Sequence, residues 1–289
     1  MKIVRLCGSS AGNIYCLLTP DDWDLGMPEG LAHWNGHAWR WIDKLSGCYS
    51  TAMICRGVKL QILDADGTIR TYDSDELLSV AKPPAFRDAV DFREFSLVRS
   101  HGLGIVGNDG LFFIVDSGSW RKIETHSHND LYCIRGQEPR CFVCGANGSL
   151  LRFDGEQCDE IKTSLHETLL HLDIGEDGSI FLAGVGEDGA FLCEYHNASI
   201  VRHNAPSVIF SVAVISEKEV YCSTTENGVI VWDGSRFAQC LPHGTVLTQF
   251  ARAGRHLIVG TVEDDGNSIL SDPPSWRQLS VTLDESFLN

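Results

Sequence analysis

The most constraining feature of the sequence is a turn dipeptide, Asp-Gly or Asn-Gly, that recurs at a nearly constant interval. The six copies are Asp66-Gly67, Asp109-Gly110, Asn147-Gly148, Asp188-Gly189, Asn227-Gly228 and Asp265-Gly266. Successive copies lie 38 to 43 residues apart, and each is flanked by short runs rich in Val, Ile, Leu, Phe and Cys. These dipeptides favour the tight turns that close β-hairpins, because such turns need positive φ at their central residues. The sequence therefore predicts a repeated β-hairpin unit.

A second signature follows the turns: an apolar segment that ends in an aromatic residue and Asp, as in residues 230–234 (IVWDG) and 151–155 (LRFDG). Residues 31–36 supply it for a first unit, in which a longer loop replaces the tight turn. Seven units of about 40 residues, each reading as four short strands, are typical of a β-propeller. We predict an all-β, seven-bladed β-propeller of four-stranded antiparallel blades, forming one domain over residues 1–289. The expected blades are 1–46, 47–93, 94–126, 127–164, 165–203, 204–243 and 244–289.

One unit carries a fuller motif. Residues 203–234 contain His203, an apolar strand pair, Asn227-Gly228 and then Trp232-Asp233. This order resembles the WD-repeat pattern, which implies a propeller with a His in front of the inner strand of a blade. His128, His166 and His243 are expected at equivalent places of other units.

Two segments interrupt the period, at residues 19–30 and 73–94. The first lengthens a loop between the second and third strands, and the second lies between two units. Within the second, residues 75–82 are expected to form a short helix that stops at Pro83-Pro84. Loops between second and third strands share one face of a propeller with loops between blades. Both insertions are therefore expected on the same face as the Asp-Gly turns.

The charge balance limits the classes of partner that the chain is expected to bind. The chain has 39 acidic and 23 basic residues, a net charge of −16. Nucleic acids and anionic lipids are disfavoured because their phosphates need clustered Lys and Arg. Acidic residues in the insertions and turns indicate a surface for a basic protein, although the turn preference of Asp explains many of them equally well. With two aromatic anchors, the predicted partner-binding set is Asp21, Asp22, Trp23, Asp24, Asp75, Glu76, Phe86, Asp109, Asp188, Glu226, Asp264 and Asp265.

We therefore expect a non-catalytic protein-binding propeller, for example an immunity-type protein that neutralises a basic toxin. A scaffold or adaptor subunit explains the same features. The alternative from another class is a lyase or hydrolase in which His128, His166, His203 and His243 bind a metal or act as bases at the channel mouth. No cofactor and no catalytic residue are otherwise expected.

The cysteine count bears on the compartment. Eleven cysteines are an odd number, and the N-terminal segment has no continuous apolar region of the signal-peptide kind. The cysteines are expected to be reduced and mostly buried, which predicts a cytoplasmic protein. The sequence leaves the oligomeric state open.

Overall fold

The computed structural model describes residues 2–19, 29–45, 50–56, 59–84, 92–99, 102–137, 140–196, 199–241, 246–247, 250–253, 256–263, 266–271, 273, 277–281 and 283. In this part of the chain all regular structure is β-strand, arranged in seven antiparallel sheets. The expectation of an all-β chain built from repeated four-stranded sheets is confirmed. The described residues hold no helix that is long and apolar enough to span a bilayer.

The chain forms two compact units. The first comprises residues 1–81 and 243–289, and the second comprises residues 82–242. The strands of the first unit are β1 (Lys2–Ser10), β2 (Asn13–Thr19), β3 (Glu29–Trp34), β4 (Trp39–Leu45), β5 (Ser50–Arg56), β6 (Lys59–Asp64), β7 (Ile69–Asp73), β8 (Glu76–Ala81), β25 (Val246–Leu247), β26 (Ala251–Ala253), β27 (His256–Glu263), β28 (Gly266–Ser271) and β29 (Arg277–Ser280). They form the sheets β1–β4 and β5–β8 and a third sheet from β25 to β29.

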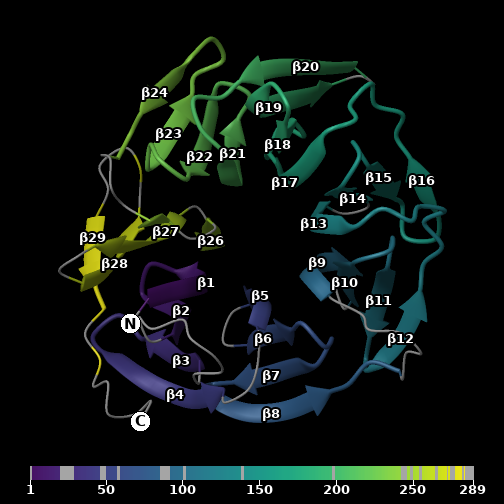
Figure 1. Ribbon diagram of the computed structural model, residues 1–289. Helices are drawn as coiled ribbons and strands as arrows, with labels where there is room; N and C mark the ends of the chain where they lie inside the picture. The colour runs from purple at the N-terminus through teal and green to yellow at the C-terminus, as the bar shows by residue number, and fades with distance from the viewer. Residues whose placement is uncertain are drawn as a thin grey trace. The chain divides into compact units, whose positions relative to one another are not determined.

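The second unit contains four sheets of four strands (Figure 1). Its strands are β9 (Phe92–Arg99), β10 (Gly102–Gly107), β11 (Phe112–Asp116), β12 (Ser119–Lys122), β13 (Leu131–Gln137), β14 (Arg140–Gly145), β15 (Leu150–Phe153), β16 (Cys158–Glu160), β17 (Thr168–Ile174), β18 (Ile180–Gly186), β19 (Gly189–His196), β20 (Ser199–Asn204), β21 (Ile209–Ser216), β22 (Glu219–Thr224), β23 (Val229–Trp232) and β24 (Phe237–Gln239). In each sheet the strands pair in chain order. The first strands lie against one another in the succession β9, β13, β17, β21.

The position of a strand within its sheet determines how its side chains are buried. The second strand β10 (GLGIVG) is buried at all six positions, whereas the fourth strand β12 (SWRK) is exposed or half-buried. A strand that is apolar on both faces needs a neighbouring sheet on each side. The core accordingly lies between successive sheets, as where Phe112 of one sheet meets Phe153 of the next with ring centroids 5.1 Å apart. Stacked sheets thus bury apolar surface that no single sheet could bury.

The expectation of a helix over residues 75–82 is wrong. Residues 76–81 form β8, the fourth strand of its sheet, which pairs with β7 from Asp73↔Glu76 to Ile69↔Ala81. Ser74 and Asp75 have φ of 51° and 72°, so they make a tight turn that returns the chain to β7. Pairing with an adjacent strand prevails over the weak local preference for a helix. The expected insertion at 73–94 therefore contains a regular strand, and residues 85–91 of it lie outside the described residues.

Candidate functional site

Exposed carboxylates gather at one edge of the second unit. Asp109 lies between β10 and β11, Asp188 between β18 and β19, and Glu226 between β22 and β23, and all three are exposed. Each position is a turn between the second and third strands, so in an antiparallel sheet it lies at the end opposite the other two turns. We call the side chains of these three residues the acidic turn edge.

Hydrogen bonds hold this edge together. The N–H of Gly110 donates to the carbonyl of Asn129 at 2.8 Å, and the N–H of Gly148 donates to that of Glu167 at 2.7 Å. Each bond links a turn to the loop that leads to the next sheet. Gly110 has φ of +68°, and a Cβ there would lie 1.9 Å from the carbonyl oxygen of Ser127. Glycine is needed for the left-handed backbone and for this close approach. The turns at Gly110 and Gly148 and the loops bonded to them therefore form a hydrogen-bonded rim.

The three carboxylates of the acidic turn edge have no hydrogen-bond or ion-pair partner in the described part of the chain. Three acidic residues in turns at the opposite end of the sheets of the second unit differ. Asp233 accepts hydrogen bonds from the Ser235 hydroxyl at 2.7 Å and from two backbone N–H groups. The Ser235 hydroxyl and these N–H groups lower the pKa of Asp233 to about 2. Asp154 and Asp177 similarly accept bonds within their own turns. Turn chemistry therefore accounts for these three acids.

Asp75 is not available to a partner, which corrects its assignment to the binding set. Its carboxylate accepts hydrogen bonds from the Tyr15 hydroxyl and the His33 Nδ1, each at 2.9 Å, and is also paired with Arg40. Only 7% of its side chain is exposed, because the β7–β8 turn directs it inward. Glu76 is exposed, but it lies at the β7–β8 turn. That turn is at the end of the sheet opposite the β6–β7 turn, so the expected shared face is wrong for Glu76.

Several predicted residues lie outside the described part of the chain. These are Asp21, Asp22, Trp23, Asp24, Phe86, His243, Asp264 and Asp265.

The three described members of the predicted histidine constellation, His128, His166 and His203, occupy different kinds of position. His128 and His166 are exposed in the loops before β13 and β17. His203 lies on the fourth strand β20, not before an inner strand, and its ring is 4.2 Å from that of Trp232 in the next sheet. Packing against Trp232 uses this imidazole as part of the core. Among the residues that could be searched for metal-ligand groups, none of these histidines belongs to one.

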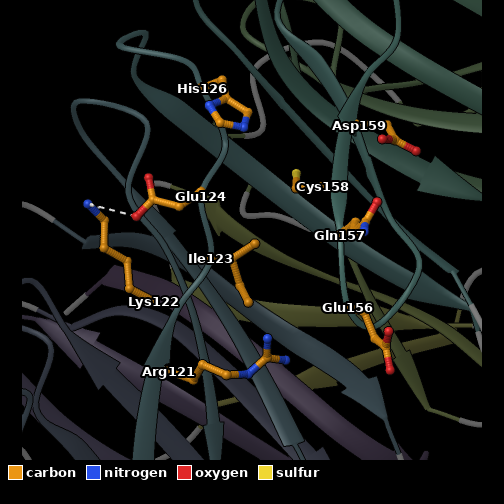
Figure 2. Close-up of a pocket in the computed structure, with 9 residues that line it drawn as sticks. All are labelled: Arg121, Lys122, Ile123, Glu124, His126, Glu156, Gln157, Cys158 and Asp159. Carbon is orange, nitrogen blue, oxygen red and sulfur yellow. Dashed lines mark ion pairs between the residues drawn. The ribbon is translucent and has the colours of Figure 1, made fainter.

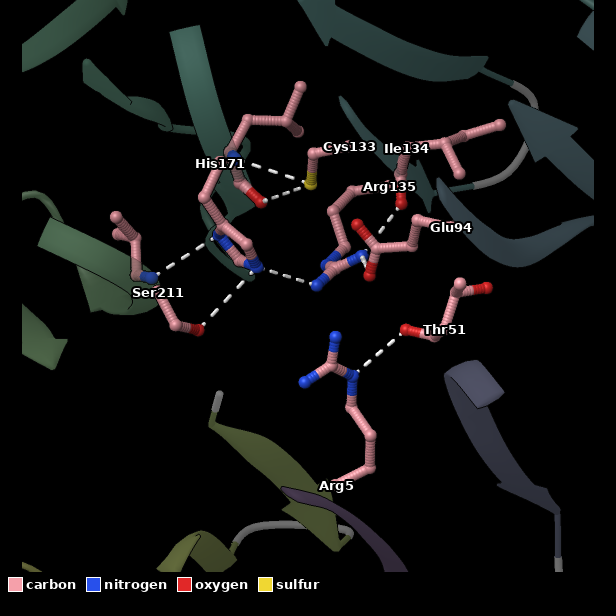
Figure 3. A network of polar contacts seen from close by, with 10 residues as sticks. Arg5, Thr51, Glu94, Cys133, Ile134, Arg135, His171 and Ser211 are labelled. Atoms are coloured by element: carbon pink, nitrogen blue, oxygen red, sulfur yellow. Dashed lines mark hydrogen bonds and ion pairs between the residues drawn. The ribbon is translucent and has the colours of Figure 1, made fainter. Parts of the chain in front are cut away.

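The structure reveals instead a polar network on the first strands of the second unit (Figure 3). Arg135 of β13 donates through Nη1 to Glu94 Oε1 of β9 at 2.5 Å, and its Nη2 lies 2.8 Å from His171 Nε2 of β17. The backbone N–H of Val212 on β21 donates to His171 Nδ1 at 3.2 Å. Burial, and then the charge of Arg135, lowers the pKa of His171 well below its usual value. One chain of contacts thus connects four successive sheets.

Three members of this region have the atoms of a metal site. Ligand atoms of Glu94, Cys133 and His171 lie within 4.8 Å of one another, and all three residues are buried. The guanidinium of Arg135, however, already contacts Glu94 and His171. Its positive charge opposes a divalent cation, and burial raises the pKa of the Cys133 thiol well above its usual value. We therefore assign the network to holding the first strands together.

Sequence reasoning missed this network because its members are far apart in the chain. Glu94 and Arg135 are 41 residues apart, and Arg135 and His171 are 36 apart. The available signal was the presence of opposite charges, Glu94 and Arg135, in two first strands about one repeat apart.

A cavity of about 430 Å³ lies between β12 and β16 (Figure 2). Arg121 and Lys122 line one side, and Glu156 and Asp159 line the other. Lys122 is also 3.9 Å from Glu124. Both signs of charge are present, so the cavity does not select a ligand of one charge.

Comparison with known proteins shows the fold. No family model matches the chain, and no curated protein matches it. One similar structure is described as the extracellular domain of the putative one component system BT4673 from B. thetaiotaomicron, with TM-score 0.68 and 15% identity over 93% of this chain. This chain covers 38% of that protein.

Two further structures agree. YCF48 bound to D1 peptide is similar with TM-score 0.68 and 10% identity, covering 99% of this chain and 93% of that one. A chain of a mitotic checkpoint complex is similar with TM-score 0.72 and 15% identity, covering 95% and 86%. Together with the repeated four-stranded sheets, these similarities show a WD-like β-propeller, as the sequence predicted.

Proposed function

We propose that this propeller is a protein-binding module whose acidic turn edge receives a basic protein. The observation that carries the proposal is the contrast between the three carboxylates of the acidic turn edge and three engaged carboxylates in turns at the other end of the sheets in the second unit. Carboxylates at one end are exposed and have no partner among the described residues, whereas Asp154, Asp177 and Asp233 at the other end are engaged by their own turns. Unengaged charge at a rigid rim is ready to pair with cations of another molecule.

The charge of the whole chain also supports a basic protein as the partner. A net charge of −16 attracts cationic proteins at long range and raises their association rate. Two structures with the same fold are described as bound to a peptide and as part of a protein complex. These descriptions concern those proteins, and they make protein binding a reasonable use of this fold.

The finer proposal is an immunity-type role in the cytoplasm, in which the partner is a basic toxin such as a nuclease. A scaffold or adaptor would use the same edge but hold a second protein at the same time. Size and mass of the purified complex distinguish the two, because a one-to-one complex that silences the partner's activity supports neutralisation. A ternary complex in which the partner stays active supports an adaptor.

The test compares two triple variants that remove the same charge from opposite ends of the sheets. One is Asp109→Asn, Asp188→Asn and Glu226→Gln. The matched control is Asp116→Asn, Glu176→Gln and Glu217→Gln, whose exposed acids lie at turns of the other end. Partners are captured with the wild-type chain, identified by mass spectrometry and then purified for affinity measurements.

We expect a basic partner whose Kd rises roughly tenfold, or about 1.4 kcal/mol, in the first triple variant and changes little in the control. Binding by the wild type should weaken as salt is added, because exposed charges are screened. Equal effects of the two triple variants, or affinity that is insensitive to salt, would show that the acidic turn edge is not the binding surface.

A further inference from the structure

Two cysteine side chains meet between the first two sheets of the first unit. Cys7 lies on β1 and Cys55 on β5, the first strands of neighbouring sheets that lie against each other. Arg5 of β1 donates through Nε to the carbonyl of Thr51 on β5 at 2.9 Å (Figure 3), which fixes the two strands side by side. Cys7 belongs to an apolar cluster against which Cys55 packs, and the Cys7 thiol is the leading influence on the pKa of Cys55. The pair is therefore already in contact as thiols.

Cys55 differs from the other half-buried cysteines. Cys55, Cys158 and Cys240 are all half-buried, so exposure alone would make them similarly reactive. Hydrogen bonds from Cys7, and also from Ser9, hold the pKa of the Cys55 thiol below its usual value despite partial burial. Burial raises the pKa of Cys158 to about 12 and also raises that of Cys240. The thiolate is the nucleophilic form, so Cys55 is the most nucleophilic of these three.

Cys7 has a complementary character. It is only 6% exposed, and burial raises its pKa well above the usual value. It therefore remains a protonated thiol that donates its hydrogen bond to Cys55. A buried thiol beside a half-buried thiol of lowered pKa is an arrangement in which an oxidised sulfur can be captured by its neighbour.

We propose that Cys55 is a reactive thiol that hydrogen peroxide or an organic peroxide oxidises, and that Cys7 resolves the product into a Cys7–Cys55 disulfide. The Cys55 thiolate attacks one peroxide oxygen, the O–O bond breaks, and a sulfenic acid and hydroxide (or alkoxide) form. The Cys7 sulfur then attacks the Cys55 sulfur, the S–O bond breaks, and the Cys7 proton leaves with the hydroxyl as water. The two thiols lose two electrons, which the peroxide gains.

The product would link β1 to β5 and so join the first two sheets covalently. This modification site is independent of the acidic turn edge, because all of its residues lie in the first unit. Either proposal can fail without affecting the other.

The first experiment measures reactivity in the folded, reduced chain. A limiting amount of iodoacetamide at neutral pH is followed by mass spectrometry of the peptides that contain Cys55, Cys158 and Cys240. We expect Cys55 to be alkylated several times faster than the other two. Ser9→Ala should slow the alkylation of Cys55 and leave the alkylation rates of Cys158 and Cys240 unchanged. A general loosening of the fold would not have this selective effect.

The second experiment applies hydrogen peroxide. In the wild type we expect a Cys7–Cys55 cross-linked peptide that has lost two hydrogens. Cys7→Ser should leave a Cys55 sulfenic acid that dimedone traps, and Cys158→Ser, the control, should behave as the wild type does. If Cys7→Ser fails to fold, the alkylation rates and the cross-linked peptides of the wild type still test the proposal. Equal alkylation of the three half-buried cysteines, or no Cys7–Cys55 cross-link, overturns the proposal.

Discussion

At the scale of single residues, the imidazole of His171 is almost fully shielded from water. It is 1% exposed, and both of its nitrogens face N–H groups, one from Val212 and one from Arg135. A proton added to this ring would be surrounded by donors and would lie beside a guanidinium charge. The folded chain therefore keeps His171 neutral.

This neutrality predicts how stability depends on pH. The pKa of His171 is depressed in the folded state, whereas in the unfolded chain it is about 6.5. Below pH 6.5 the unfolded state takes up a proton that the folded state refuses, so the free energy of unfolding falls as the pH falls. The loss from this one residue approaches about 1.4 kcal/mol per pH unit.

Urea denaturation of the wild type and of His171→Gln between pH 7.5 and pH 5 measures the effect. The variant should have the shallower dependence on pH even if it is less stable throughout. A residual slope is expected from His33, because burial and Arg40 lower its pKa to about 4. Identical slopes in the two proteins would contradict the buried-imidazole account.

At the scale of elements, two turns show two different reasons why glycine is needed: a left-handed backbone and a close approach of a neighbouring loop. Gly110 and Gly118 lie in turns at opposite ends of the same sheet, and both have positive φ, +68° and +81°. A Cβ at Gly110 would meet the Ser127 carbonyl, whereas a Cβ at Gly118 has nothing within 4 Å. The pair thus distinguishes backbone strain from close packing.

Alanine at each position should give different losses of stability. Gly118→Ala has only the left-handed backbone to overcome, which costs about 1–2 kcal/mol. Gly110→Ala should cost clearly more, since the loop that holds Asn129 must also move. Thermal or urea unfolding of both variants checks this difference. Equal losses would mean that the loop yields freely and that the rim is less rigid than its hydrogen bonds indicate.

Elements also show what the sequence could predict. The Asp-Gly and Asn-Gly repeats located the sheets because hairpin turns are encoded by neighbouring residues. Residues 76–81 were misassigned because Leu77, Leu78 and Val80 fit either a helix or a strand, and pairing with β7 decides. The contacts of Asp75 with Tyr15 and of Arg135 with His171 join residues 60 and 36 positions apart. No local pattern encodes such contacts. The exposure of Asp109, Asp188 and Glu226, by contrast, could be predicted because each residue lies in a turn that neighbouring residues encode.

At the scale of the whole molecule, the net charge of −16 is a cost as well as a means of attraction. Like charges repel one another more strongly in the folded chain than in the expanded unfolded chain. Salt screens this repulsion within a Debye length of about 10 Å at 0.1 M.

We therefore expect the melting temperature to rise as the NaCl concentration increases from about 10 mM to about 0.15 M, because the added salt screens the repulsion. Asp109→Asn, Asp188→Asn and Glu226→Gln together change the net charge from −16 to −13. The melting temperature of this variant should therefore rise less with salt than that of the wild type. Scanning fluorimetry of both proteins at matched pH tests the expectation. A melting temperature that falls with salt would mean that attractive surface ion pairs, such as the exposed Arg152–Asp159, outweigh the repulsion.

The contrast between the two ends of the sheets also decides where the chain can be lengthened. At Gly110 and Gly148 the turns are bonded to neighbouring loops, so added residues would separate one sheet from the next. A Cβ built at Gly118 meets nothing within 4 Å, so this turn has room for added residues. A peptide tag or a fluorescent reporter inserted at this position leaves the hydrogen-bonded rim intact. It would also mark the molecule from the side away from the acidic turn edge.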